Sequence, residues 1–230
     1  MANLQSTYTN EHLQKTQSPH WYPTEWIIRT MAGSYPNLAL DKRIYENAKV
    51  LDIGFGDGRN FTLLKNLGLK IYGVEITEEI VQSVQNKAKH NGIDCELKVG
   101  SNADIPYPNE YFDIILASSS MYYINTPNSF NDTVAEYMRV LKKGGVLIAN
   151  FPEKKKNFIC KNALELDDNV IEITNDIYNL RNGYLFKVFS SENELKTYSD
   201  AFLTNISTAY LYENYFGVAI SMFILVGHKK

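Results

Sequence analysis

A glycine-rich turn between an apolar run and a helical stretch limits the fold of this chain more than any other feature. The apolar run Lys49–Ile53 ends in Gly54-Phe55-Gly56-Asp57-Gly58, and residues 59–67 follow with helical character. Glycine lets the backbone turn sharply and approach a ligand at contact distance, because it has no Cβ. A strand, a turn of this kind and a helix in succession are typical of an open α/β sheet. In such sheets the ligand binds beyond the carboxyl ends of the strands.

The rest of the chain repeats this alternation of strands and helices. Further strands are expected over residues 70–75, 95–99, 111–117 and 146–151, with helices over 78–90, 130–141 and from 191 onward. Two β-rich runs, 202–212 and 217–227, close the chain with only a short turn between them, so they should pair antiparallel. The pattern predicts a Rossmann-like, doubly wound α/β fold. Its sheet would be mostly parallel and seven-stranded, with an antiparallel C-terminal strand.

Length and composition predict one domain without metal or disulfides. The chain has 230 residues, 44% of them hydrophobic, and a net charge of −3, which suits a single globular domain and disfavours nucleic-acid binding. Its two cysteines form no Cys-x-x-Cys, and its four histidines show no metal-ligand spacing. The domain is expected to span 1–230. Within it, residues 1–45 would cap the ligand and residues 153–183 would form an insertion on the side of a second substrate.

No membrane segment or targeting signal is expected. The longest apolar run, 216–226, is shorter than the roughly 20 residues that a spanning helix needs, and the N-terminus is polar. The sequence therefore predicts a soluble, cytoplasmic protein, and it predicts no oligomeric state.

The spacing of glycines and acids separates two classes of cofactor. Glu75 ends the second expected strand, where a carboxylate can accept both hydroxyls of an adenosine ribose, as it also does in nicotinamide enzymes. The dinucleotide fingerprint would put its third glycine at position 59, which is Arg59, whereas this chain has Gly58. Asp52, two residues before Gly54, suits a ligand that carries an ammonium and a sulfonium better than a pyrophosphate, because like charges repel.

The pattern Asp-x-Gly-x-Gly-x-Gly, followed by an acid-ended second strand, resembles the class I S-adenosylmethionine-dependent methyltransferases. Residues 100–107, 111–115 and 139–145 are similar to later segments of that family, although Ser101 stands where the family usually has Asp. The resemblance implies that Gly54, Gly56 and Gly58 form the cofactor loop. It also implies that Asp52 holds the amino-acid end, Glu75 the ribose, and Asn102 and Ala103 the adenine. By the same resemblance, five further residues belong to the cofactor site: Tyr22, Phe55, Asn60, Ile76 and Ser118.

The acceptor side has weaker signals. Similar methyltransferases close an N-terminal helix over the cofactor. A helix with Pro23 in its first turn would put Trp26 and Arg29 on one face, and Arg29 would then pair with the methionyl carboxylate. His20 and Tyr123 are the expected catalytic residues. Residues 154–156, a lysine triplet, would attract an anionic acceptor, although such triplets more often lie in solvated loops.

Competing enzyme classes fit less well. A short-chain dehydrogenase needs a Tyr-x-x-x-Lys downstream of the glycine loop, and the only one here, Tyr45 to Lys49, precedes it. The chain also lacks the Asp/Asn-Pro-Pro-Tyr of base- and glutamine-methylating enzymes and the Pro-Cys of cytosine C5 enzymes. The expected function is transfer of a methyl group from S-adenosylmethionine to an oxygen, less favourably a nitrogen, of a small polar acceptor. Anionic and sugar-linked acceptors are included.

Residues 20–26, His-Trp-Tyr-Pro-Thr-Glu-Trp, extend this resemblance. With the rest of the chain they are similar to small bacterial methyltransferases of surface-polysaccharide gene clusters. Two alternatives stay open at this point: a non-catalytic cofactor-binding module and a nicotinamide-dependent oxidoreductase.

Overall fold

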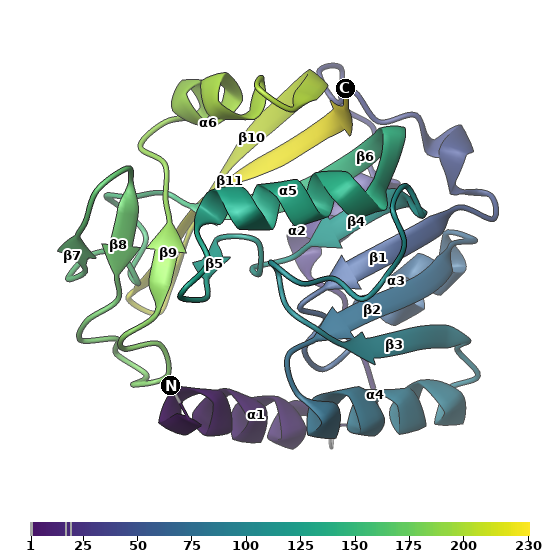
Figure 1. Ribbon diagram of the computed structural model, residues 1–230, viewed down its shortest axis with the longest axis horizontal. Helices are drawn as coiled ribbons and strands as arrows, with labels where there is room; N and C mark the ends of the chain where they lie inside the picture. Colours follow the sequence, from purple (N-terminus) through teal and green to yellow (C-terminus); the bar gives the residue numbers. More distant parts are fainter. Residues whose placement is uncertain (1, 17, 19) are drawn as a thin grey trace.

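A seven-stranded sheet forms the centre of the protein. The computed structural model describes residues 2–16, 18 and 20–230 (Figure 1). The strand order is β10-β11-β6-β4-β1-β2-β3, and β11 alone runs antiparallel to its neighbours. The strands are β1 Lys49–Ile53, β2 Lys70–Glu75, β3 Cys95–Val99, β4 Phe112–Ala117, β6 Leu141–Pro152, β10 Leu203–Tyr215 and β11 Val218–Lys229. The expected doubly wound sheet with an antiparallel C-terminal strand is confirmed.

Helices cover both faces of this sheet, because successive strand residues point to opposite sides. Val50 of β1 packs in a cluster with α2 Glu25–Ala32, α3 Phe61–Asn66 and α4 Glu78–His90. Leu51, its neighbour, packs on the other face with α5 Phe130–Val140 and α6 Glu192–Ser199. The near-continuous apolar character of β1 and β4 follows from this double burial.

The element boundaries differ from expectation in three places. The helix after the glycine loop begins at Phe61, with Asn60 as its N-cap, so Arg59 lies in the turn before it. The helix α5 ends at Val140, because Leu141 is already extended and pairs with Phe112 of β4. The two closing strands are longer than expected and leave a turn of only Phe216 and Gly217, both with positive φ, as in the tight turns that match strand twist.

A second, four-stranded antiparallel sheet takes three strands from the stretch between β6 and α6 and one from the segment between β4 and α5. Its order is β5-β9-β8-β7, with β5 Tyr123–Ile124, β7 Leu164–Glu165, β8 Val170–Glu172 and β9 Leu185–Lys187. The sequence pattern did not predict these strands, which are two or three residues long. Figure 1 shows this small sheet beside the carboxyl ends of β1, β2 and β4. Residues of the small sheet therefore face the ligand-binding edge of the large one.

The N-terminal region contributes two helices. The helix α1, Ala2–Thr16, was not predicted as a helix; it packs against α4 and extends below the small sheet (Figure 1). A short 3₁₀ turn, Lys42–Tyr45, leads into β1. Pro23 lies just outside α2, whose N-cap is Thr24, rather than in its first turn. In the part of the chain that the structure describes, no helix has the length and apolarity to cross a membrane.

Candidate active site

A cavity of about 380 Å³ lies at the carboxyl ends of the central strands. Ile53 ends β1, Glu75 ends β2 and Ser118 follows β4, and all three residues line it. The helix α1 and the small sheet contribute the rest of the wall. The cavity thus lies where an open α/β sheet binds its ligands, and its volume is that of a small-molecule site.

The glycine loop forms one end of this cavity. Gly54, Gly56 and Gly58 have φ values of 67°, 56° and 75°, which residues with a Cβ rarely adopt. A Cβ on Gly54 would lie 2.6 Å from the Ser120 side chain, and one on Gly56 would lie 2.8 Å from His12. Gly54, Phe55 and Gly56 line the cavity, whereas Gly58 packs against Val84 and Trp21 behind it. The first two glycines are therefore the ones that bring the backbone of the loop to the cavity wall, packed closely against Ser120 and His12.

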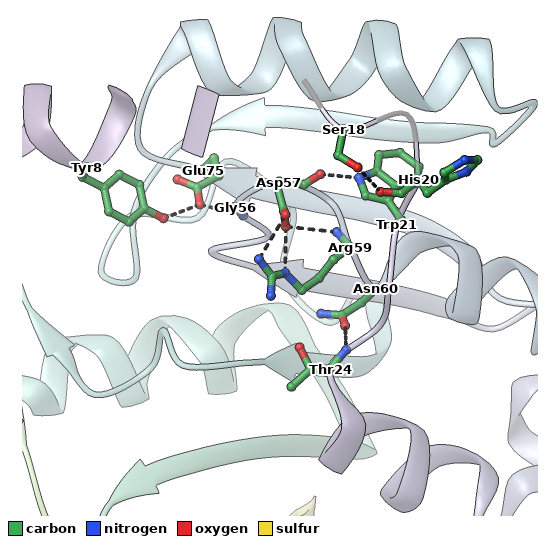
Figure 2. A network of polar contacts seen from close by, with 10 residues as sticks. All are labelled: Tyr8, Ser18, His20, Trp21, Thr24, Gly56, Asp57, Arg59, Asn60 and Glu75. Carbon is green, nitrogen blue, oxygen red and sulfur yellow. Dashed lines mark hydrogen bonds and ion pairs between the residues drawn. The ribbon is translucent and has the colours of Figure 1, made fainter. Parts of the chain in front are cut away.

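Glu75 lies beside this loop with its carboxylate directed at three donors. Its Oε1 accepts hydrogen bonds from the Tyr8 hydroxyl at 2.7 Å and the Gly56 amide at 2.9 Å, and its Oε2 accepts one from the Ile76 amide at 2.8 Å. Burial raises the pKa of Glu75, and these hydrogen bonds act in the opposite direction. The carboxylate is in the position expected for holding paired hydroxyls, and Figure 2 shows Tyr8 occupying one side of it.

Asp52 lies on β1 below the loop rather than on the cavity wall. Its side chain is fully buried, and neither carboxylate oxygen has a hydrogen-bond partner. Burial, together with the charges of Glu75 and Asp57, raises the pKa of Asp52 to about 8, and the nearby Asn60 side chain acts in the opposite direction without reaching hydrogen-bond geometry. A buried acid without a partner is costly, so its position favours a ligand that brings positive charge to the loop.

The segment after β3 supplies part of the opposite wall. Asn102 lines the cavity, but its amide is already engaged: Nδ2 donates to the Ser120 carbonyl at 2.8 Å, and Oδ1 accepts from the Tyr137 hydroxyl at 2.9 Å. Ser118 and Ile76 also line the cavity, whereas Ala103 does not. Asn102 therefore holds the shape of the wall, and Ala103, expected beside adenine, lies outside the described lining.

A polar network connects the loop to the N-terminal region (Figure 2). Arg59 forms a two-pronged ion pair with Asp57, with Nε–Oδ1 at 2.9 Å and Nη2–Oδ2 at 3.0 Å. Asn60, which also lines the cavity, accepts a hydrogen bond from the Thr24 amide at 3.2 Å. Trp21 donates its indole N–H to the Asp57 carbonyl. These contacts fix the residues that precede α2 against the glycine loop.

Three residues expected in the site lie outside it. Arg29 lies on the exposed face of α2, where it pairs with Glu25 at 2.7 Å, because a spacing of four residues places both on one helix face. Tyr22 is 76% exposed. His20 is exposed, and Figure 2 shows its imidazole pointing away from Glu75 and Arg59. The structure corrects the predicted placements: Arg29 does not face the cofactor end, and His20 does not reach the cavity.

Tyr123, the other expected catalytic residue, does line the cavity. Its ring stacks against Tyr122 with centroids 5.0 Å apart and meets Tyr184 edge-on at 5.4 Å. Burial raises the pKa of the Tyr123 phenol, while the charge and hydrogen bond of Arg181 act in the opposite direction. Since the net shift is upward, Tyr123 stays protonated near neutral pH and can donate a hydrogen bond but cannot act as a base.

Several lining residues were missed by the sequence analysis or given no role in the site. Tyr8, Glu11 and His12 come from α1, where Glu11 and His12 lie about one helical turn after Tyr8, and all three line the cavity. Arg181 comes from the loop before β9. The lysine triplet does not reach the cavity: Lys154 pairs with Glu165 at 3.0 Å, outside the described lining.

Comparisons with known proteins agree with this geometry. Residues 51–149 match the family described as "Methyltransferase domain". Residues 51–149 form a methyltransferase domain. The matched residues extend from β1 to β6, so this methyltransferase domain contains the glycine loop, Glu75 and the wall formed by Asn102.

Individual relatives match part or most of the chain. A ubiquinone biosynthesis O-methyltransferase of Pelagibacter ubique is 27% identical over 115 residues, which are 50% of this chain and 46% of that protein. The chain spans about half the length of the curated relatives it matches. An S-adenosylmethionine-dependent methyltransferase of Methanosarcina mazei has a TM-score of 0.63 at 20% identity, covering 85% of this chain and 98% of the other.

A third relative contains a cofactor product. The 1,6-didemethyltoxoflavin-N1-methyltransferase of Burkholderia thailandensis, solved with 1,6-didemethyltoxoflavin and S-adenosylhomocysteine, has a TM-score of 0.61 at 15% identity. The match covers 84% of this chain and 76% of the Burkholderia chain. These structural likenesses show the fold of the methyltransferase domain. S-adenosylmethionine is the cofactor of such a domain.

The residues of this methyltransferase domain fit that cofactor. Gly54 and Gly56 line the cavity without a side chain, so their backbone is accessible to a ligand. Glu75 supplies acceptors for hydroxyl groups, and the unpartnered carboxyl of Asp52 favours a cationic ligand. The loop end of the cavity is therefore polar at Glu75, where a ribose would need hydrogen bonds, and Asp52 lies buried behind the loop.

Proposed function

We propose that this protein transfers the methyl group of S-adenosylmethionine to an oxygen of a small polar acceptor. One observation carries the proposal: a single cavity joins the glycine loop and Glu75 to a second end lined by Tyr123, Tyr184 and Arg181. A cofactor held at the first end would leave the second end for an acceptor. The second end belongs largely to the small sheet and its loops, which is the part of the chain expected to hold the acceptor.

The protein's own residues position the two reactants. S-adenosylmethionine supplies an activated methyl group on a sulfonium, so alignment and exclusion of water are the main needs. Gly54 and Gly56 let the backbone approach the cofactor, and Glu75 orients it. Tyr123 donates a hydrogen bond to the acceptor rather than removing its proton. An acceptor oxygen that is already ionised or readily loses a proton fits a site of this kind best.

The acceptor that we propose is a sugar-linked or anionic molecule of the kind found in capsule or surface-polysaccharide synthesis. This assignment is supported by Asn125, which lines the cavity and whose amide can offer hydrogen bonds to a polyol. The amides of Asn150 and Asn157 line the same cavity but are engaged within the protein. The named relatives methylate both oxygen and nitrogen, so they favour neither atom. The nicotinamide alternative fits less well, because the carboxyl of Glu75 lines the cavity beside the glycine loop and the chain has Arg59 where the dinucleotide fingerprint has its third glycine.

A methyl-transfer assay tests the proposal. The protein is incubated with S-adenosylmethionine labelled in its methyl group and with a panel of phosphorylated and nucleotide-linked sugars, and label in the acceptor is counted. We expect transfer to at least one member and loss of most of that transfer in Tyr123→Phe. Binding of the cofactor product without transfer to any acceptor would instead support a non-catalytic cofactor-binding module.

A further inference from the structure

Arg181 occupies a distinct place in the acceptor end of the cavity. It belongs to the loop between β8 and β9, and it lines the cavity together with Tyr123 and Tyr184. Its side chain is 25% exposed, so most of the guanidinium is withdrawn from bulk water. A cation in such a position needs compensating charge or hydrogen bonds.

The loop that presents Arg181 is held from within by Asp176. The Asp176 side chain is fully buried, and its carboxylate accepts hydrogen bonds from the backbone amides of Tyr178, Leu180 and Arg181 at 3.3, 3.1 and 3.1 Å. A carboxylate that bonds several backbone amides fixes the path of a turn. The backbone at Arg181 is therefore positioned before any ligand arrives.

Asp176 compensates the charge of Arg181 only in part. Arg181 Nη1 lies 3.5 Å from Asp176 Oδ2, and that oxygen is also shared with the amides of Leu180 and Arg181. Arg59, in contrast, engages Asp57 through two contacts of 2.9 and 3.0 Å. A guanidinium has five N–H donors, and a two-pronged oxyanion partner satisfies them best. Arg181 keeps donors for such a partner.

The surroundings of Arg181 confine where that partner can lie. The Tyr123 phenol lines the cavity with Arg181, whose charge acts to lower the pKa of that phenol, and Tyr184 packs edge-on against Tyr123. Glu11 of α1 lines the same cavity and adds negative charge near Tyr123. The oxyanion of a ligand is therefore favoured at Arg181 itself, within the aromatic wall, rather than across the whole cavity.

We propose that Arg181 and the Tyr123 hydroxyl form an anion subsite that anchors a carboxylate or phosphate group of the methyl acceptor. This inference rests on the proposed function, because it places the acceptor in the cavity shared with the cofactor. It narrows the acceptor to small molecules that carry an oxyanion, and it makes Arg181 the residue that selects them.

Calorimetric titrations with three small ligands test the subsite. Phenyl phosphate, benzoate and the uncharged benzyl alcohol are titrated into the protein, with and without saturating S-adenosylhomocysteine. We expect one or both anions to bind at millimolar concentrations or better and benzyl alcohol to bind at least tenfold more weakly. The stronger of the two anions distinguishes a phosphate from a carboxylate acceptor.

Three variants assign the effect to Arg181. Arg181→Gln is expected to weaken anion binding at least tenfold and to leave the affinity for S-adenosylhomocysteine within threefold of the wild type. Arg181→Lys keeps the charge but not the fork of donors, so an intermediate loss is expected. Arg43→Gln removes an exposed arginine that pairs with Asp41, and it should change neither affinity. Melting temperatures establish that each variant is folded.

The outcomes separate the subsite from the proposed function. Equal binding of benzyl alcohol and the anions, no anion binding at millimolar concentrations, or unchanged anion binding in folded Arg181→Gln or Arg181→Lys would each overturn the subsite. If S-adenosylhomocysteine fails to bind while the anions depend on Arg181, the proposed function fails and the anion subsite stands.

Discussion

The Tyr8 hydroxyl lies 2.7 Å from Oε1 of Glu75, the carboxylate that we propose holds the cofactor ribose. Gly56 donates to the same oxygen, so Oε1 already has two partners. Its companion Oε2 accepts from the Ile76 amide. A ribose hydroxyl that is to bond Oε1 has to displace Tyr8, because the phenol occupies that direction of approach. The helix α1 therefore competes with the cofactor at one atom.

Replacing Tyr8 by phenylalanine tests this competition. Tyr8→Phe removes the hydroxyl and keeps the ring, which contacts His12. Because a hydrogen bond contributes about 1 kcal/mol net, the affinity for S-adenosylhomocysteine should rise roughly threefold to tenfold. Calorimetry measures it directly. A lower affinity would mean that the Tyr8 hydroxyl contacts the bound cofactor instead of competing with it.

Alanine variants at two glycines with similar φ distinguish an effect on ligand binding from an effect of backbone strain. Gly56 and Gly92 have φ of 56° and 61°, but a Cβ on Gly92 meets nothing within 4 Å, while one on Gly56 meets His12 at 2.8 Å. Both alanine variants should lose about 1 kcal/mol of unfolding free energy in urea. Only Gly56→Ala should also weaken S-adenosylhomocysteine binding tenfold or more. Equal binding by the two variants would show that the space above Gly56 is not used by the ligand.

The buried acid Asp52 predicts a pH-dependent stability difference. Its pKa is about 8 in the folded protein, far above the unfolded value. Below the unfolded pKa the carboxyl is neutral in both states, so its contribution to stability is fully present. That contribution is lost as the pH rises from the unfolded pKa through the folded pKa, because the unfolded chain releases this proton more readily than the folded protein does.

Asp52→Asn removes this titration. Near pH 4 the variant should melt at nearly the same temperature as the wild type. As the pH rises to 8 its melting temperature should exceed that of the wild type by a growing margin. The corresponding gain in unfolding free energy is more than about 1.4 kcal/mol, the equivalent of one pKa unit. Thermal melts across this range measure the difference. The same substitution should weaken the binding of S-adenosylhomocysteine, because the asparagine side chain does not attract the ammonium group of that ligand. A constant melting difference at all pH values would contradict the raised pKa.

The core of the fold could be predicted because its signals are local. Strands buried on both faces, such as β1, are short apolar runs, and helices such as α4 carry a periodic apolar face between Thr77 and Asn91. The helix α1 has no comparable stripe, since Ala2–Thr16 is polar on most sides. The strands of the small sheet are too short for alternation to be read, so tertiary pairing decides them.

The position of the cavity was predictable from the strand ends, whereas the placement of several of its expected residues was not. The placement of Gly54, Gly56 and Glu75 follows from the strand ends, which the sequence pattern marks. Arg29 was misplaced because its partner Glu25, one helical turn away, keeps it on the exposed face. Arg181 reaches the cavity from a loop that is held by Asp176. No periodic sequence pattern predicts a contact between a loop carboxylate and the backbone of the same loop.

Loss of the Glu75 carboxylate tests its assignment to the ribose. Glu75→Ala should weaken S-adenosylhomocysteine binding by about 1–3 kcal/mol, because a charged acceptor of hydrogen bonds is lost. Glu96→Ala, an exposed acid of the neighbouring strand β3, is a matched control that should leave binding unchanged. Unaltered affinity in a folded Glu75→Ala variant would remove Glu75 from the cofactor site.

The most direct measurement is calorimetric titration of the wild-type protein with S-adenosylhomocysteine, with NAD as the parallel ligand. We predict micromolar binding of S-adenosylhomocysteine and no binding of NAD. No binding of S-adenosylhomocysteine, or a preference for NAD, would contradict the assignment of the glycine loop and Glu75 to a methyl-donor site.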